Sequence, residues 1–253
     1  MTDLVERLRA AGCVFAEEEA ALLEAEAPDV ATLDAWAARR VDGEPLETIV
    51  GWAELDGVRV TVAPGVFVPR RRSALLVREA VAHLRPGGVL VDLCCGSGAL
   101  GLVAALRVPG VVLHAVDLEP AAVACAAANL VQVGGVAHEG DLDAPLPADL
   151  RGRVDVLVAN APYVPSDAIA SMPPEARDHE PQVALDGGAD GLDVLRRVLA
   201  VAPRWLAPTG IVVVECSRSQ APHLVAAAVA EGLRPHQVAD PELDATAVVA
   251  RLG

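Results

Sequence analysis

One segment constrains the fold of this chain more than any other: an apolar run, a glycine-rich turn and the start of a helix in direct succession. The apolar run Val89–Cys94 leads into Gly96-Ser97-Gly98, and the stretch that begins at Ala99 has helical spacing. Glycines in such a turn tolerate positive φ and let a ligand approach the backbone closely. A strand, a glycine turn and a helix in this order are typical of the ligand-binding start of a doubly wound α/β fold. The segment therefore predicts a ligand site at the carboxyl edge of a parallel sheet.

The chain from residue 73 onward continues this alternation of strands and helices. Apolar runs predict strands at 89–94, 111–118, 136–141, 154–160 and 211–216. Helical spacing predicts helices at 73–84, 99–106, 120–133, 192–206 and 219–231. Repeated βα units favour a parallel sheet with helices on both faces. The last two candidate strands, 235–239 and 246–252, have no helix between them, so we expect a closing antiparallel hairpin.

The first 72 residues differ from that pattern and predict two smaller units. Residues 1–42 place apolar side chains at roughly helical spacing among acidic ones, which predicts a small helical domain. Residues 43–72 contain β-rich pieces at 49–50, 58–62 and 66–68, separated by turns that include Asp56-Gly57. We therefore expect a helical domain at 1–42, a β-hairpin linker at 43–72 and the α/β domain at 73–253.

The charge and the cysteines limit the classes of function. The formal net charge is −15, and an acidic surface repels phosphates, so nucleic acid is not expected as a direct substrate. The N-terminus lacks a secretory pattern, and no apolar run reaches the roughly 18 uncharged residues of a membrane helix. The five cysteines are an odd number without metal-like pairing to histidine, which indicates reduced thiols. We expect a cytoplasmic monomer with no membrane partner and no metal site.

Three acidic residues at strand ends indicate the class of ligand. Asp92 lies just before the glycine turn, where a carboxylate would oppose a pyrophosphate but suit a sulfonium with its α-amino group. Asp117 ends the next strand, where an acid can accept hydrogen bonds from both ribose hydroxyls. Asp141, after Gly140, ends the third strand, where an adenine edge would lie. We interpret this set as a site for S-adenosylmethionine. The alternatives are a dinucleotide, which the spacing of Gly96, Gly98 and Gly101 also fits, and acids that only cap strands.

The fourth strand ends in the tetrapeptide Asn160-Ala161-Pro162-Tyr163. Ligands of open parallel sheets bind beyond the carboxyl ends of the strands. An amide or aniline-like nitrogen is a poor nucleophile because its lone pair is delocalised. The Asn160 side-chain oxygen and the Ala161 carbonyl would accept hydrogen bonds from such an NH₂ group and orient it for methyl transfer. Tyr163 would stack on a planar substrate group. In the alternative interpretation Asn160 forms a turn and Tyr163 only packs.

With these motifs the chain resembles the protein-(glutamine-N5) methyltransferases, the release factor glutamine methyltransferase family also called HemK/PrmC. The resemblance covers nearly the whole chain and extends to Gly43-Glu44-Pro45-Leu46, Val66-Phe67-Val68-Pro69-Arg70, Asn129, Glu180-Pro181, and Glu215 with Gln220. It implies a class I S-adenosylmethionine-dependent methyltransferase, a Rossmann-like α/β fold with a seven-stranded, mostly parallel sheet. It also implies methyl transfer to the side-chain amide of a glutamine in a protein such as a release factor, with S-adenosylhomocysteine as the product.

The motifs and the resemblance together assign the site residues. The predicted cofactor-binding residues are Phe67, Pro69, Arg70, Asp92, Cys94, Gly96, Gly98, Asp117, Leu118, Gly140, Asp141, Leu142 and Asn160. The predicted catalytic and substrate-binding residues are Asn160, Ala161, Pro162 and Tyr163, with Glu180 as a further substrate contact.

The chain departs from the family pattern in places that concern the substrate. Ala161 replaces the first proline of the usual Asn-Pro-Pro-Tyr, and Arg71-Arg72-Ser73-Ala74 replaces the usual Pro-Glu-Thr-Glu. The region before Gly43 is shorter than is typical by roughly thirty residues, the length of a few short helices. Two alternatives therefore stay open. One is N-methylation of a small-molecule amine or amide, or of the exocyclic amine of a nucleobase. The other is a module that binds S-adenosylmethionine without catalysis.

Overall fold

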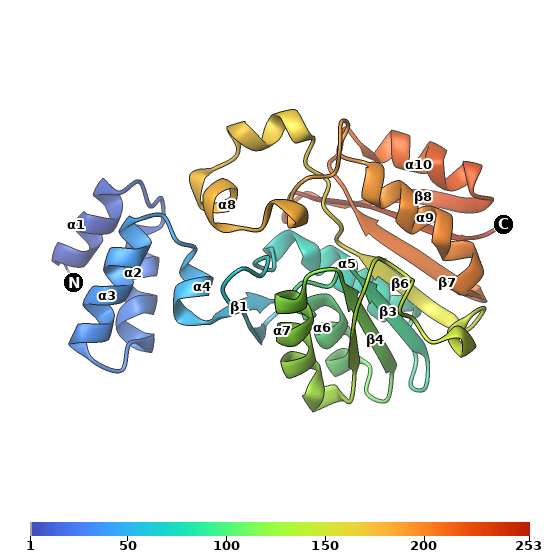
Figure 1. Cartoon of the computed structure of the whole chain (residues 1–253), viewed down its shortest axis with the longest axis horizontal. Coiled ribbons are helices and arrows are strands. Elements are labelled where there is room, and N and C mark those ends of the chain that lie inside the picture. The colour runs from blue at the N-terminus through green and yellow to red at the C-terminus, as the bar shows by residue number, and fades with distance from the viewer. Residues whose placement is uncertain (1) are drawn as a thin grey trace.

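A twisted seven-stranded sheet forms the centre of this computed structural model, which describes residues 2–253 (Figure 1). The strands are ordered β5-β4-β3-β6-β7-β9-β8 across the sheet. Their bounds are β3 (Val89–Leu93), β4 (Val112–Asp117), β5 (Val136–Glu139), β6 (Val154–Ala159), β7 (Leu206–Glu215), β8 (Leu233–Asp240) and β9 (Ala245–Leu252). The first five strands are parallel, and β9 is antiparallel to both of its neighbours. The predicted parallel sheet with a closing antiparallel hairpin is confirmed.

Helices cover both faces of this sheet, as the continuous apolar strands predict. One face packs against α5 (Ala74–His83), α6 (Ala99–Arg107) and α7 (Pro120–Leu130), and the other against α9 (Asp193–Trp205) and α10 (Ala221–Ala230). All five residues of β3 are buried, because this strand lies in the middle of the sheet between both helix layers. None of the described helices combines the length and the apolarity that crossing a membrane requires.

The N-terminal helices form a separate small core beside the sheet domain (Figure 1). They are α1 (Thr2–Ala10), α2 (Ala16–Glu26), α3 (Val30–Val41) and α4 (Leu46–Val50). Asp29 caps α3, because its side chain accepts a hydrogen bond from the Thr32 backbone N–H at 2.7 Å. The strand expected at residues 49–50 was wrong. These residues end α4, which starts after Pro45 and stops at Gly51 in the left-handed conformation, and Ile49 packs into the N-terminal core.

The predicted β-hairpin consists of β1 (Trp52–Leu55) and β2 (Val58–Thr61), and its turn residues Asp56 and Gly57 both have positive φ. Asn129 on α7 fixes the end of this hairpin. Its Oδ1 accepts from the Thr61 N–H at 3.1 Å, and its Nδ2 donates to the carbonyls of Thr61 and Ser97, both at 2.9 Å. The hairpin is thereby tied to the glycine turn after β3. The strand expected at 66–68 was wrong, since this segment, in which Val66 and Val68 are buried, pairs with no other strand in the described chain.

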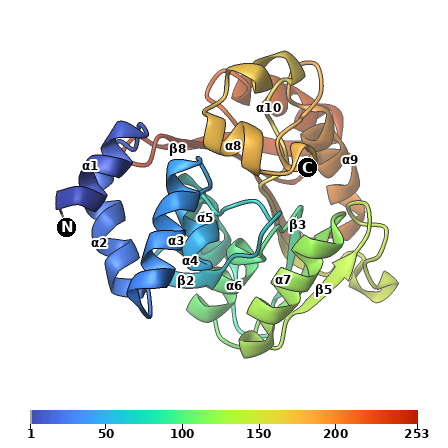
Figure 2. The same cartoon turned by 60° about the vertical axis from the view of Figure 1, so that its left-hand side comes forward.

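The long connection between β6 and α9 contains only short helices. They are η4 (Ser166–Ser171), α8 (Pro174–His179) and η5 (Gln182–Ala184). Three further short helices lie outside this connection, namely η1 (Arg71–Ser73), η2 (Val131–Val133) and η3 (Ala148–Leu150). Figures 1 and 2 place α8 between the N-terminal helices and the layer of α9 and α10. Buried Arg40 joins these parts, because it forms ion pairs with Glu19 on α2 and with Glu175 on α8. The connection therefore bridges the two units above the carboxyl edge of the sheet.

Candidate active site

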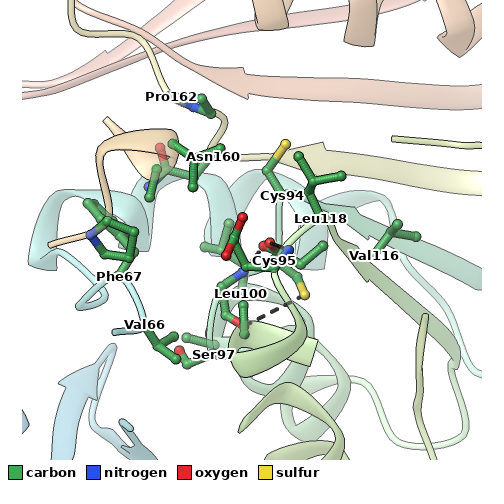
Figure 3. A pocket seen from close by; sticks show the side chains of 18 of the residues that line it. Val66, Phe67, Cys94, Cys95, Ser97, Leu100, Val116, Leu118, Asn160 and Pro162 are labelled. Atoms are coloured by element: carbon green, nitrogen blue, oxygen red, sulfur yellow. Dashed lines mark hydrogen bonds between the residues drawn. The ribbon is translucent and has the colours of Figure 1, made fainter. Parts of the chain in front are cut away.

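The carboxyl ends of β3, β4, β5 and β6 open into one cavity, whose empty space including its mouth is about 1050 Å³. It lies where the strand order reverses, between β3 and β6, which is the usual ligand site of doubly wound sheets. Figure 3 shows its walls with side chains from the segment after the hairpin, the glycine turn and the strand ends. The predicted cofactor residues that line it are Phe67, Pro69, Cys94, Gly96, Asp117, Leu118, Gly140, Asp141, Leu142 and Asn160.

Asp117 is fixed at the edge of the cavity by two backbone hydrogen bonds. Its Oδ2 accepts from the Gly96 N–H at 2.8 Å, and its Oδ1 accepts from the Glu119 N–H at 3.0 Å. Gly96 itself has a φ of 56°, so the turn depends on the conformational freedom of glycine here. Each carboxylate oxygen retains a lone pair, and apolar Leu118 lies beside it on the wall. A fixed acceptor pair next to an apolar wall fits the ribose and base of a nucleoside ligand.

Asp92 lies behind the glycine turn and not on the cavity wall. The residue is fully buried, and its Oδ2 accepts from the Gly101 N–H at 2.9 Å. Its Oδ1 has no hydrogen-bond partner anywhere in residues 2–253. Burial raises the pKa of this carboxyl to about 8. In this structure the side chain supports the turn from below, because β3 directs it under the first turn of α6.

Two further predicted cofactor residues also lie off the wall. Gly98 has a φ of 74° at the start of α6, and a Cβ there would lie 3.1 Å from the Cβ of Ala126. This glycine therefore permits the close packing of α6 on α7. The guanidinium of Arg70 forms an ion pair with Glu180 at 2.6 Å instead of facing the cavity.

Asn160 marks the other end of the cavity, directly after β6 (Figure 3). Its Nδ2 donates to the Ser73 hydroxyl at 3.1 Å, and Ser73 and Pro162 also line the cavity. Among the described residues, none donates a hydrogen bond to Asn160 Oδ1. Ala161 is buried and absent from the wall, since only 1% of its surface is exposed. An amide oxygen with free acceptor capacity therefore faces the same cavity as Asp117.

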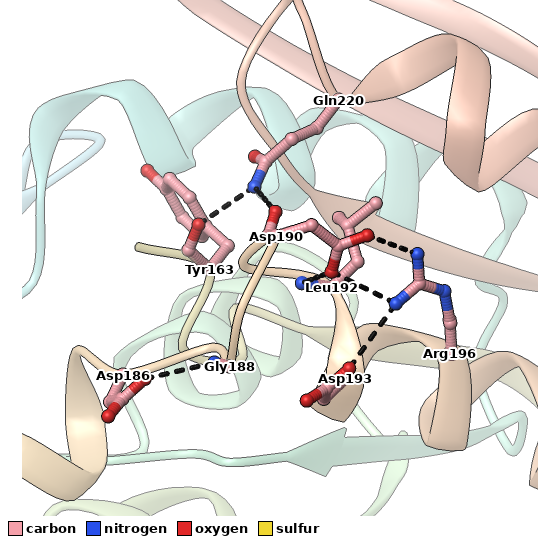
Figure 4. A network of polar contacts seen from close by, with 8 residues as sticks. All are labelled: Tyr163, Asp186, Gly188, Asp190, Leu192, Asp193, Arg196 and Gln220. Carbon is pink, nitrogen blue, oxygen red and sulfur yellow. Dashed lines mark hydrogen bonds and ion pairs between the residues drawn. The ribbon is translucent and has the colours of Figure 1, made fainter. Parts of the chain in front are cut away.

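Tyr163 lies beside the cavity and packs within the protein. Its hydroxyl donates to Glu215 Oε1 at 3.1 Å, and the Arg72 guanidinium lies 5.7 Å from the centre of its ring. Gln220 fixes the backbone here, because its Nε2 donates to the carbonyls of Tyr163 at 2.9 Å and Asp190 at 3.1 Å (Figure 4). Burial raises the pKa of the Tyr163 hydroxyl above its usual range. These contacts make Tyr163 an anchor of the tetrapeptide in this structure.

Glu180 also has a structural position. Its side chain is 2% exposed, and its carboxylate accepts from the Val68 N–H at 3.2 Å and from Arg70 at 2.6 Å. Burial raises the pKa of this carboxyl. Glu180 thus joins the segment after the hairpin to the long connection, and it does not line the cavity.

Sequence reasoning missed several residues of the wall. They are chiefly Val66, Ser73, Pro181, Val183, Ala184 and Arg197. Arg197 comes from α9 and forms an ion pair with Asp141 at 2.6 Å. Val66 and Pro181 belong to segments of the family resemblance, and Ser73 belongs to the departure from the usual Pro-Glu-Thr-Glu, so these three carried a signal. The others are ordinary helix or loop residues that the fold brings to the cavity.

Comparison with known proteins gives the class of this fold. Residues 57–173 match the methyltransferase small domain. A release factor glutamine methyltransferase from Gloeobacter violaceus is 39% identical over 209 residues, covering 80% of this chain and 71% of that protein. A 4-amino-L-phenylalanine/4-methylamino-L-phenylalanine methyltransferase from Streptomyces pristinaespiralis is 36% identical over 184 residues, covering 70% of this chain and 62% of that protein.

A solved structure gives the same class. The 16S rRNA N2 G1207 methyltransferase of T. Thermophilus, in complex with AdoMet and guanosine, has a TM-score of 0.58 at 22% identity. The match covers 80% of this chain and 50% of that one. Together with the seven-stranded sheet, this likeness confirms the class I methyltransferase fold.

Proposed function

Because this chain belongs to the release factor glutamine methyltransferase family, we propose that it transfers a methyl group from S-adenosylmethionine to the side-chain amide nitrogen of a protein glutamine. The observation that carries the proposal is the orientation of Asn160. Its Nδ2 is engaged by Ser73 at 3.1 Å, so its Oδ1 is left to accept a hydrogen bond in the cavity. An amide NH₂ has two hydrogens to donate and fits such an acceptor.

The acceptor side of the site works by orientation. Asn160 Oδ1 accepts one hydrogen of the substrate NH₂, and we assign the other hydrogen to the backbone carbonyl of Ala161, the next residue, although Ala161 itself does not line the cavity in this structure. Two acceptors fix the plane of the group, and with it the direction in which the nitrogen can attack. Pro162 on the wall and the contacts of Tyr163 keep the tetrapeptide rigid. A strong general base is not required, because the nitrogen loses its proton readily once it is methylated.

The donor side of the site binds and shields the cofactor. S-adenosylmethionine, when bound, supplies a methyl group on a positively charged sulfur. Asp117, Leu118 and Leu142 line the cavity; Asp117 would accept hydrogen bonds from the ribose, and the two leucines would enclose the base. Phe67 closes the cavity from the side of the hairpin and limits the access of water. The Arg70 guanidinium lies over its ring, 5.0 Å from the ring centre.

We propose that the protein acts as a monomer in the cytoplasm and that its partner is a release factor. The named activity of the Gloeobacter violaceus relative supports this partner. The helical domain lies next to α8, to which Arg40 is joined by its ion pair with Glu175, and we propose that a protein substrate docks beside these helices (Figure 2).

The test is methyl transfer from labelled S-adenosylmethionine to a purified release factor and to a glutamine peptide from it, read by mass spectrometry. We expect one methyl group on one glutamine. Asn160→Ala should abolish this transfer, while the affinity for S-adenosylhomocysteine, measured by calorimetry, stays at the wild-type level. A wild-type protein that binds the cofactor and methylates neither acceptor would refute the assignment of glutamine.

A second candidate substrate is a small aromatic amine, favoured by the named activity of the Streptomyces pristinaespiralis relative. An arylamine also presents a planar NH₂ group whose lone pair is delocalised, so it needs the same two acceptors. Adding 4-amino-L-phenylalanine to the acceptor panel separates the two candidates. Transfer to this amino acid but not to the release factor would establish the second one, and cofactor binding without any transfer would indicate a silent module.

A further inference from the structure

A buried carboxylate at the end of β7 is connected to Asn160 through one hydroxyl. Glu215 is 1% exposed, and its Oε2 accepts from the Ser73 hydroxyl at 2.7 Å. The same Ser73 oxygen accepts from Asn160 Nδ2 at 3.1 Å. Glu215 does not itself line the cavity, so its influence on the site passes through Ser73.

The positions of the hydrogens in this chain of contacts follow from which groups can donate. Arg72 can only donate, and its Nε donates to Glu215 Oε1 at 2.9 Å; the carboxylate of this ion pair can only accept. Ser73 must therefore use its single hydrogen for Glu215. Its oxygen then offers only lone pairs, and of the two ends of the Asn160 amide only the NH₂ can bind to them.

We propose that Glu215 is a positioning residue that sets the polarity of the Asn160 amide: through Ser73 it turns Nδ2 inward and Oδ1 toward the acceptor nitrogen. This inference rests on the proposed function, in which that nitrogen belongs to an NH₂ group that must donate. An amide with the opposite orientation would present its own NH₂ to the substrate NH₂. The two donors would repel each other, and the nitrogen would lose its orientation.

The variant Glu215→Gln should exchange donor and acceptor in the hydrogen bonds that connect residue 215 through Ser73 to Asn160. Arg72 will still require the side-chain oxygen, so the new NH₂ group faces Ser73. Ser73 then accepts from this group and donates its hydrogen to Asn160 Oδ1. With the amide reversed, we expect kcat to fall at least about 100-fold, the order of loss for a misplaced reacting group. The affinity for S-adenosylhomocysteine should not change.

Ser73→Ala provides the contrast, because it frees the amide without reversing it. Asn160 can then still present Oδ1 to the substrate, so we expect a loss of only about tenfold in kcat, the equivalent of one hydrogen bond. The double variant Glu215→Gln, Ser73→Ala should therefore be more active than Glu215→Gln alone and close to Ser73→Ala. Glu231→Gln, at an exposed position after α10, is the control for the substitution itself and should retain wild-type activity.

A double variant that is no more active than Glu215→Gln would overturn the proposal, since a purely structural role predicts that the two defects add. Side-chain amide NMR of ¹⁵N-labelled protein tests the same idea without any acceptor or any Glu215 variant. One Asn160 Nδ2 hydrogen should be protected from solvent exchange in the wild type and lose that protection in Ser73→Ala. Unchanged protection would refute the proposed hydrogen bond from Asn160 to Ser73, and with it the influence of Glu215 on Asn160. A wild type that fails to methylate release factor and peptide, with the protection present, would instead count against the proposed substrate.

Discussion

Asp117→Ala should weaken the binding of S-adenosylmethionine and of S-adenosylhomocysteine. The carboxylate at the cavity edge is fixed by two N–H donors, Gly96 at 2.8 Å and Glu119 at 3.0 Å, so it is in place before the ribose arrives. Hydrogen bonds to a charged group contribute about 1.5–3 kcal/mol. Losing them corresponds to a rise in Kd of roughly 10- to 150-fold. Calorimetric titration with S-adenosylhomocysteine measures this change directly.

Asp155→Ala is the matched control for this substitution. Asp155 also accepts a backbone hydrogen bond, from the Val89 N–H at 2.8 Å, but it lies at the beginning of β6, the opposite edge of the sheet. Both variants should lose stability in chemical unfolding by about 1.5–3 kcal/mol for the broken charged hydrogen bonds. Only Asp117→Ala should lose cofactor affinity. Unchanged affinity in a folded Asp117→Ala protein, or an equal loss in Asp155→Ala, would show that this carboxylate does not contact the ribose.

Three other substitutions test the structure around the site. An alanine in the left-handed conformation costs about 1–2 kcal/mol. Gly98→Ala should destabilise the protein by more than this, because its Cβ would also meet α7. Gly134→Ala is the control: its φ is similar but the space around it is open, so it should cost only the conformational amount. Equal losses in chemical unfolding would contradict the packing argument. Asn129→Asp should cost about 1–3 kcal/mol, because it replaces the NH₂ that donates to the carbonyls of Thr61 and buried Ser97 by an acceptor. An unchanged unfolding midpoint would show that these hydrogen bonds contribute nothing. His114 and His138 stack with their ring nitrogens 2.9 Å apart, and burial lowers the pKa of both below the usual 6.5. At acidic pH the folded state then binds fewer protons than the unfolded state. The contribution of these histidines to the free energy of unfolding is fully present above pH 6.5 and is lost as the pH falls through the lowered pKa values. His138→Gln should reduce the dependence of the unfolding free energy on pH in this range. A pH dependence equal to that of the wild type would exclude the histidine pair as its source.

The order of strands and helices, and the place of the cavity, were predictable because they depend on local properties of the sequence. The apolar run before Gly96 is long enough to be a strand buried on both faces, and the glycines mark the turn that must approach a ligand. Asp117 ends one strand of the parallel sheet and Asn160 directly follows another, so both had to reach the same edge. The same reasoning failed at residues 49–50 and 66–68. A short apolar stretch fits a strand, a helix end or a buried loop equally well, and only its neighbours decide.

The sequence by itself therefore determined the methyltransferase architecture and placed Asn160 at the end of β6. Only the tertiary structure decided how the surrounding side chains are used. It buried Asp92 behind the turn, directed Tyr163 toward Glu215 and brought Ser73 to Asn160 from 87 residues away. Hydrogen bonds of this kind join segments whose distance along the chain is unrelated to any periodicity. Their partners, and the polarity that they impose on the Asn160 amide, become defined only when the sheet, the hairpin segment and the long connection pack together.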